Sequence, residues 1–121
     1  MNAQKGTPRR PAVQQLHVND KALGLMIDAI AKLSHEEHCF ATLSDVLVDA
    51  LRIPTDEEIL RSISANELQS LVGEHQIFVR IPLETTQEFE MMKKTVGAAF
   101  PGRFGMREAV CYCCMISIAK K

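Results

Sequence analysis

Hydrophobic residues recur with two different periods along this chain of 121 residues. Alternation at every second position predicts strands over residues 12–18 and 76–81, with Leu16 and Val18 on one face of the first strand. Apolar residues at helical spacing predict helices between the two strands and after the second one. The expected helices are 21–33, 43–53, 84–96 and 106–119.

Capping residues mark the ends of these helices. Thr42, followed three residues later by Asp45, predicts a capping box at the start of the second helix. Residues 34–40 are expected to form a polar turn, and residues 55–72 a further helical stretch that Gly73 caps. The stripe of the first helix that is expected to face the core comprises Leu23, Met26, Ile27, Ile30 and Leu33.

The order strand, helix, turn, helix occurs twice, at an offset of 63 residues. Leu16 then matches Val79 and Met26 matches Phe89, so residue class agrees although identity is low. One copy of about 40 residues offers too small a core, and its single strand has two unpaired edges. Pairing the two strands antiparallel solves both problems. The sequence therefore predicts a mainly α fold with a two-stranded antiparallel β-ribbon.

The charge distribution supports a division of the chain into four parts, although the formal net charge of the whole chain is only −1. At about 1.5 Å per helical residue, a linker of some 20 residues can cross such a domain, so both repeats are expected to form one domain. The parts are a flexible basic arm over residues 1–11 (net +3), repeat 1 over 12–53 (net −3), an acidic helical linker over 54–75 (net −4) and repeat 2 over 76–121 (net +3).

Composition excludes several classes of protein. No apolar run approaches the roughly 18 residues of a membrane helix, and the N-terminus lacks the apolar stretch of a signal peptide. Four cysteines in such a chain are expected to be reduced thiols. Tryptophan is absent and aromatic residues are few, which argues against a stacking platform for single-stranded nucleic acid. We expect a cytoplasmic protein with no membrane partner.

Two segments resemble a known family. Residues 76–82 (QIFVRIP) form a strand that ends at a proline before a helix, and residues 42–45 (TLSD) look like the start of a second helix. Both are similar to the Arc/MetJ-type ribbon-helix-helix DNA-binding proteins. The resemblance implies sequence-specific binding of double-stranded DNA through a β-ribbon in the major groove. Most members are homodimers, whereas two repeats in one chain imply a monomer that is an intrachain pseudo-dimer.

The rarer tandem form of this family is similar to accessory factors of plasmid or T-DNA processing and transfer. The resemblance therefore implies a bacterial, cytoplasmic protein with other DNA-transfer (relaxosome) proteins as further partners, and a chain that is part of a longer protein. A transcriptional repressor or an antitoxin of the same fold is the alternative, because one fold supports several roles.

The strand face turned away from the helices carries the candidate base-reading side chains. Arginine can bind guanine O6 and N7 with two hydrogen bonds, glutamine can bind adenine, and an apolar side chain can contact the thymine methyl. The simpler alternative is a solvated strand face. Arg80 is expected at the centre of this face. The candidate base-reading residues are Val13, Gln15, His17, Gln76, Phe78 and Arg80.

Phosphate contacts are expected at the N-terminus of the second helix of each repeat, where free backbone N–H groups and the helix dipole attract an anion. Ordinary helix capping is the alternative. Because the repeats differ and repeat 2 is the more basic, we expect an asymmetric DNA site to which repeat 2 contributes more affinity. The candidate phosphate-binding residues are Arg9, Arg10, Thr42, Ser44, Arg103, Gly105 and Arg107.

Three other functions compete with DNA binding. His35, His38 and Cys39 cluster in one turn, but zinc ligands usually occur as pairs in loops, and the two histidines are expected to be solvated turn residues. Cys113 and Cys114 of the last helix fall on core positions. No phosphate loop or nucleophile elbow is present, so no catalytic residue, metal or cofactor is expected. The acidic residues 54–75 could instead dock a basic partner, which would make the chain a protein-interaction module. The cysteines of the last helix are Cys111, Cys113 and Cys114.

Overall fold

The computed structural model describes residues 12–54, 68, 70–100 and 102–120. The fold is mainly helical with one two-stranded antiparallel sheet, which confirms this level of the expected architecture. The elements are β1 (Ala12–Val18), α1 (Asp20–Glu37), α2 (Leu43–Leu51), β2 (His75–Ile81), the 3₁₀ helix η3 (Leu83–Thr85), α4 (Thr86–Ala99) and α5 (Met106–Ala119).

Strands β1 and β2 form a ribbon whose two faces differ in burial. The register pairs Ala12 with Ile81 and Val18 with His75. Leu16, Val18, Val79 and Ile81 are buried on the inner face, as the two-residue alternation predicts. The inner face is therefore the part of the ribbon that contributes to the core.

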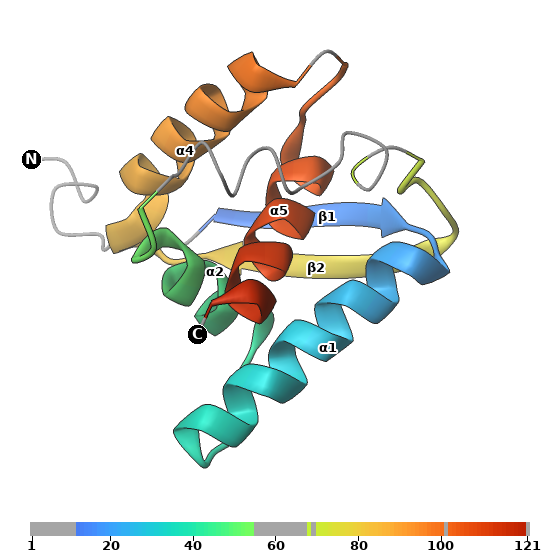
Figure 1. Cartoon of the computed structure of the whole chain (residues 1–121). Coiled ribbons are helices and arrows are strands. Elements are labelled where there is room, and N and C mark those ends of the chain that lie inside the picture. Colours follow the sequence, from blue (N-terminus) through green and yellow to red (C-terminus); the bar gives the residue numbers. More distant parts are fainter. Residues whose placement is uncertain (1–11, 55–67, 69, 101, 121) are drawn as a thin grey trace, which may run out of the picture.

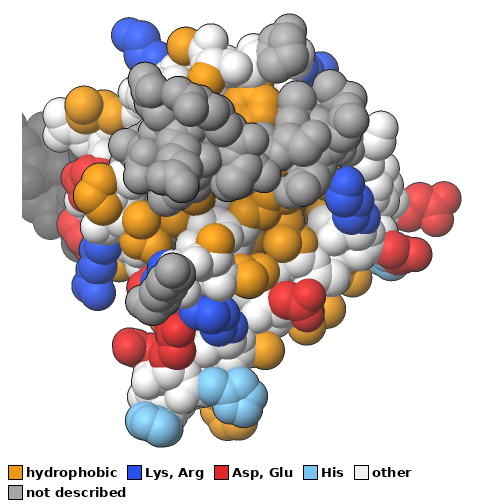
Figure 2. Space-filling view, in the orientation of Figure 1, with side chains coloured by type: hydrophobic (Ala, Val, Ile, Leu, Met, Phe, Trp, Pro, Cys, Tyr) orange, Lys and Arg blue, Asp and Glu red, His pale blue; other side chains and the backbone are white. Residues whose placement is uncertain are grey.

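Helix α5 is the centre of the core. It crosses the ribbon with α1 and α2 beside it (Figure 1) and packs against α1, α2 and β1. Every residue from Ala109 to Cys114 is buried, so this helix has no solvent-facing stripe there. In the same orientation, hydrophobic side chains gather over the helices and most charged ones lie around the rim (Figure 2). No helix in the described part of the chain is long and apolar enough to span a membrane.

Helix α1 is longer than its predicted range and replaces the expected polar turn over residues 34–37. An ion pair between Lys32 and Glu36, 2.7 Å apart and one turn apart, supports the extension. The helix ends at His38, whose left-handed conformation (φ 57°) lets the following Cys39 N–H bond the Ser34 carbonyl at 3.2 Å.

The buried stripe of α1 also differs from the predicted one. Ala22, Met26, Ala29 and Leu33 are buried, whereas Ile27 is 54% exposed. Helix α1 packs against α5, and the small Ala22 and Ala29 are on its buried face while Ile27 is on its outer face. Hydrophobicity alone ranks isoleucine above alanine, so the sequence pattern placed the wrong residue inside.

Most of the predicted acidic helical linker lies outside the described residues, as does the basic arm. Residues 68 and 70–74 contain no α-helix, but Leu68 and Leu71 are buried in the core. Asn19 donates its backbone N–H to the Leu71 carbonyl at 2.9 Å. A Cβ on Gly73 would lie 2.3 Å from the Asn19 Cα. Gly73 therefore permits a close backbone approach, and it is not a left-handed helix cap as predicted.

The helix expected over residues 84–96 begins as the 3₁₀ helix η3 and continues as α4 to Ala99. The hydroxyls of Thr85 and Thr86 both donate to the Pro82 carbonyl, at 2.9 and 3.2 Å. These bonds hold a tighter first turn than the sequence pattern indicated.

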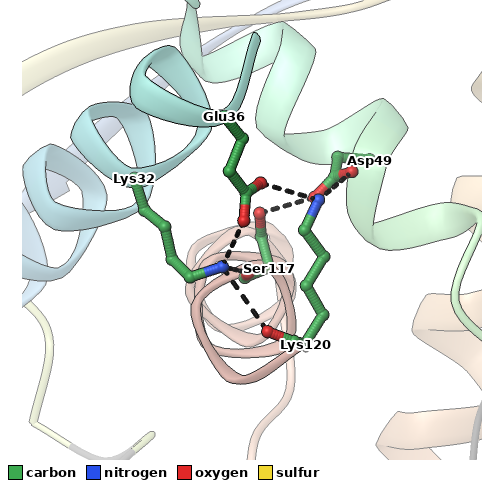
Figure 3. Close-up of polar contacts among 5 residues, drawn as sticks. All are labelled: Lys32, Glu36, Asp49, Ser117 and Lys120. Carbon is green, nitrogen blue, oxygen red and sulfur yellow. Dashed lines mark hydrogen bonds and ion pairs between the residues drawn. The ribbon is translucent and has the colours of Figure 1, made fainter.

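A charged network joins the far ends of α1, α2 and α5 (Figure 3). Lys120 Nζ lies 2.6 Å from Asp49 Oδ1 and 3.1 Å from Glu36 Oε1. Buried Ser117 donates its hydroxyl to Asp49 Oδ2 at 2.7 Å. Lys32 Nζ lies 2.7 Å from Glu36 Oε2 and 3.5 Å from the carbonyl oxygens of Ser117 and Lys120. Lys32 thus contacts carbonyls that the end of α5 leaves free.

This network predicts acid sensitivity. Hydrogen bonds from Lys32 and then Lys120 lower the pKa of Glu36 below its ordinary 4.5. A carboxylate with a lowered folded-state pKa adds stability above its unfolded pKa, and the protein loses that stability as pH falls. We expect Glu36→Gln to reduce the free energy of unfolding near neutral pH. In acid, the difference in free energy of unfolding between the variant and the wild type should become smaller. Urea denaturation from neutral pH to below about pH 4 measures this, with exposed Glu37→Gln as control. A gap that stays constant with pH would contradict the prediction.

Candidate nucleic-acid interface

Six side chains form the outer face of the ribbon, the face turned away from α5. Val13 is 54% and Phe78 62% exposed, and neither has an apolar neighbour that covers it fully. Gln15, His17, Gln76 and Arg80 are exposed as well. The outer face thus consists of two amides, one guanidinium, one imidazole and two apolar groups, without a carboxylate.

The strand register orders these side chains along the ribbon. Gln15 lies opposite Phe78 at the centre, with Val13 opposite Arg80 on one side of it and His17 opposite Gln76 on the other. Arg80 is therefore near one end of the outer face, and the expectation that it lies at the centre is wrong. Arg80 is the last outward-facing residue of β2, so its partner is Val13, the first outward-facing residue of β1.

Helix α2 begins beside Arg80. Ser44 donates its hydroxyl to the Arg80 carbonyl at 2.5 Å. Thr42 Oγ1 accepts the Asp45 N–H at 3.2 Å, and Asp45 Oδ2 accepts the Thr42 N–H at 2.9 Å, so the predicted capping box is present. These bonds occupy the amides of the cap and of Asp45. The amides of Leu43 and Ser44 have no intrahelical acceptor, which leaves two donors at this helix start.

Helix α5 begins beside His17. Arg107 donates its Nε–H to the His17 carbonyl at 2.9 Å, and its Nη1 lies 3.7 Å from Glu108 Oε2. Glu108 also accepts the Gly105 N–H at 2.9 Å. Arg103 is exposed in the loop before the helix. This end of the ribbon thus has one guanidinium attached to the strand and a second one open to solvent.

The two helix-to-strand hydrogen bonds are a feature that sequence reasoning missed. The signal was present in the numbering, because Ser44 and Arg107 are 63 residues apart, as are His17 and Arg80. Matching polar as well as apolar positions at this offset would have paired Ser44 with Arg107 and His17 with Arg80, whereas the hydrogen bonds themselves are visible only in the fold. Arg9 and Arg10, the remaining predicted phosphate contacts, lie outside the described residues.

The cysteines and histidines that suggested a metal site lie in two separate places, with His35, His38 and Cys39 together at the end of α1 and the other three cysteines in α5. Within the described ranges, no group of three or more His, Cys, Asp or Glu side chains is placed to hold a metal ion. Cys39 is exposed, whereas Cys113 and Cys114 are buried, as their core positions predicted, and Cys111 is buried as well. Burial raises the pKa of Cys111 and Cys113 to about 12, and raises that of Cys114 as well. These three thiols are therefore protonated core groups at neutral pH.

Comparisons of the chain with models of protein families, with curated proteins and with solved structures gave no significant match. The function must accordingly be argued from the geometry of the chain itself.

Proposed function

We propose that this chain binds double-stranded DNA sequence-specifically, by inserting the outer face of the ribbon into the major groove. One observation carries the proposal: six exposed side chains that suit base edges share a two-stranded ribbon, and a helix N-terminus lies beside each end of it. A two-stranded ribbon fits the width of the major groove, where each base pair has a distinct pattern of donors and acceptors. The absence of a carboxylate among the six favours a polyanionic partner.

Phe78 supports a partner for this face. An aromatic ring that is 62% exposed at the centre of a polar strand face leaves apolar area in water. In the major groove the ring would contact thymine methyl groups, which are the apolar feature of that groove. Solubility alone would favour a polar residue at this position.

We further propose that the chain is a ribbon-helix-helix pseudo-dimer, with repeat 1 over residues 12–53 and repeat 2 over 76–121. Contacts that recur at the 63-residue offset support this. Ser44 bonds the carbonyl of Arg80, and the equivalent Arg107 bonds the carbonyl of His17. Gln15 lies opposite Phe78, its own equivalent, as expected of a pair on a pseudo-two-fold axis.

Within this proposal the biological role is that of an accessory factor in plasmid or T-DNA processing and transfer. Its support is the resemblance of the tandem arrangement to such factors. Repressors and antitoxins share the fold, and a fold does not fix a role. The role therefore depends on which DNA site the protein selects.

Binding of a labelled duplex at increasing salt tests the DNA-binding proposal. Phosphate contacts release counterions, so affinity should fall steeply between about 50 and 200 mM salt. A randomised duplex mixture can be used before any site is known. Failure to bind duplex at low salt would overturn the proposal and favour a protein-interaction module.

The pseudo-dimer proposal predicts a monomer in solution. Because both repeats are in one chain, the effective concentration of one repeat near the other is about millimolar or more. No second chain is therefore needed to complete the ribbon. Sedimentation at micromolar concentration should give the mass of one chain. A dimer whose dissociation coincides with unfolding would contradict intrachain pairing.

A further inference from the structure

Each end of the ribbon combines a strand of one repeat with a helix N-terminus of the other. Arg80 of repeat 2 lies beside the start of α2 in repeat 1, because Ser44 bonds its carbonyl. His17 of repeat 1 lies beside the start of α5 in repeat 2, because Arg107 bonds its carbonyl. We name these the Arg80 end (Val13, Arg80 and the start of α2) and the Arg107 end (His17, Gln76, Arg103 and the start of α5).

The cationic groups have different positions at the two ends. At the Arg80 end the guanidinium is on the strand, and the first turn of α2 contains Asp45 but no basic residue. At the Arg107 end the strand presents His17 and Gln76, while the guanidinium groups belong to the helix start and the loop before it. The guanidinium group on the strand and the guanidinium groups at the helix start are therefore at opposite ends of the ribbon.

These positions have different consequences on a duplex. A strand side chain of an inserted ribbon faces base edges, whereas a group at the flanking helix start faces the phosphates along the groove. Arg107 is partly engaged by the His17 carbonyl and by Glu108, so the exposed Arg103 is the freer of the two for a phosphate.

We propose that the two ends divide the recognition of DNA: the Arg80 end contributes a guanine contact, and the Arg107 end holds the backbone and has no guanine preference. The inference rests on the proposed DNA-binding function. It means that the two ends of the DNA site differ, so that the protein binds the site in one orientation. Arg80, Arg103 and Arg107 all belong to repeat 2, so the proposal keeps the expectation that repeat 2 contributes more affinity.

Selection from a randomised duplex library tests the reading end. The wild type should enrich a motif with a strong guanine preference at one end only. His17→Arg places a guanidinium at the position equivalent to Arg80, so it should add a guanine preference at the other end and make the motif more palindromic. Arg80→His should remove the original preference.

Salt titration tests the holding end. Arg103→Ala should make the negative slope of log affinity against log salt shallower. The change should be about 0.9 for each phosphate that the arginine neutralises. The weakening of binding should be similar on the selected duplex and on an unrelated one. Arg52→Ala removes an exposed cation at the opposite end of α2 from Ser44 and should leave the slope unchanged.

The outcomes separate the two proposals. Equal preferences at both ends for the wild type, or a motif that His17→Arg leaves unchanged, would overturn the division of recognition and leave DNA binding intact. A slope that Arg103→Ala leaves unchanged would overturn the holding role of the Arg107 end. Failure of the wild type to retain any duplex would overturn the DNA-binding function itself.

Discussion

Arg80→Ala is expected to weaken binding to the selected duplex by roughly 1–3 kcal/mol while barely changing binding to an unrelated duplex. The side chain is exposed on the outer face and its planar guanidinium suits guanine O6 and N7. Anisotropy titrations on both duplexes at several salt concentrations measure the difference.

Removing the basic side chains of Arg9 and Arg10 is the contrasting change. If these residues contact phosphates, as their sequence context predicts, affinity should fall alike on both duplexes and the salt dependence should flatten.

The stability of Arg80→Ala should stay within about 0.5 kcal/mol of the wild type, because the site is exposed. Equal weakening on both duplexes for Arg80→Ala would instead make Arg80 a phosphate contact.

Phe89→Ala is expected to lower the free energy of unfolding by roughly 3–5 kcal/mol. Phe89 in α4 is fully buried, and its removal leaves a cavity in the close-packed core. Chemical denaturation followed by far-ultraviolet circular dichroism measures the change.

Met91→Ala is the matched control, since Met91 is on the same helix but 63% exposed. It should change stability by no more than about 0.5 kcal/mol. Similar destabilisation by both variants would mean that α4 docks on the core through a different face.

The sequence predicted the structure best along the strands, where apolar residues alternate with polar ones at every second position and the apolar ones are buried. Alternation along both strands assigned Leu16 and Val79 to the inner face, and Gln15 and Phe78 to the outer one, as the structure has them. Thr42 and Asp45 defined the start of α2, because a capping box needs only residues three apart. Such features depend on near neighbours in the chain.

Helix faces were harder to predict. The sequence favoured Ile27 over Ala29 for the core of α1, yet Ala29 is buried and Ile27 is exposed. How closely α5 packs against α1 decides this, and that distance depends on residues about 80 positions away. The end of α1 was likewise misplaced, because Lys32 and Glu36 also interact with the end of α5.

Residue order alone was enough to establish which side chains share a strand face and where α2 begins. The folded chain showed the positions along the ribbon, with Arg80 at an end and Phe78 at the centre. It also showed that the start of α2 contacts β2 and the start of α5 contacts β1. Periodicity and capping act over one or two turns of chain, so they can be recognised locally. The strand register and the contacts between each strand and a distant helix are fixed by the antiparallel arrangement that buries both inner strand faces at once.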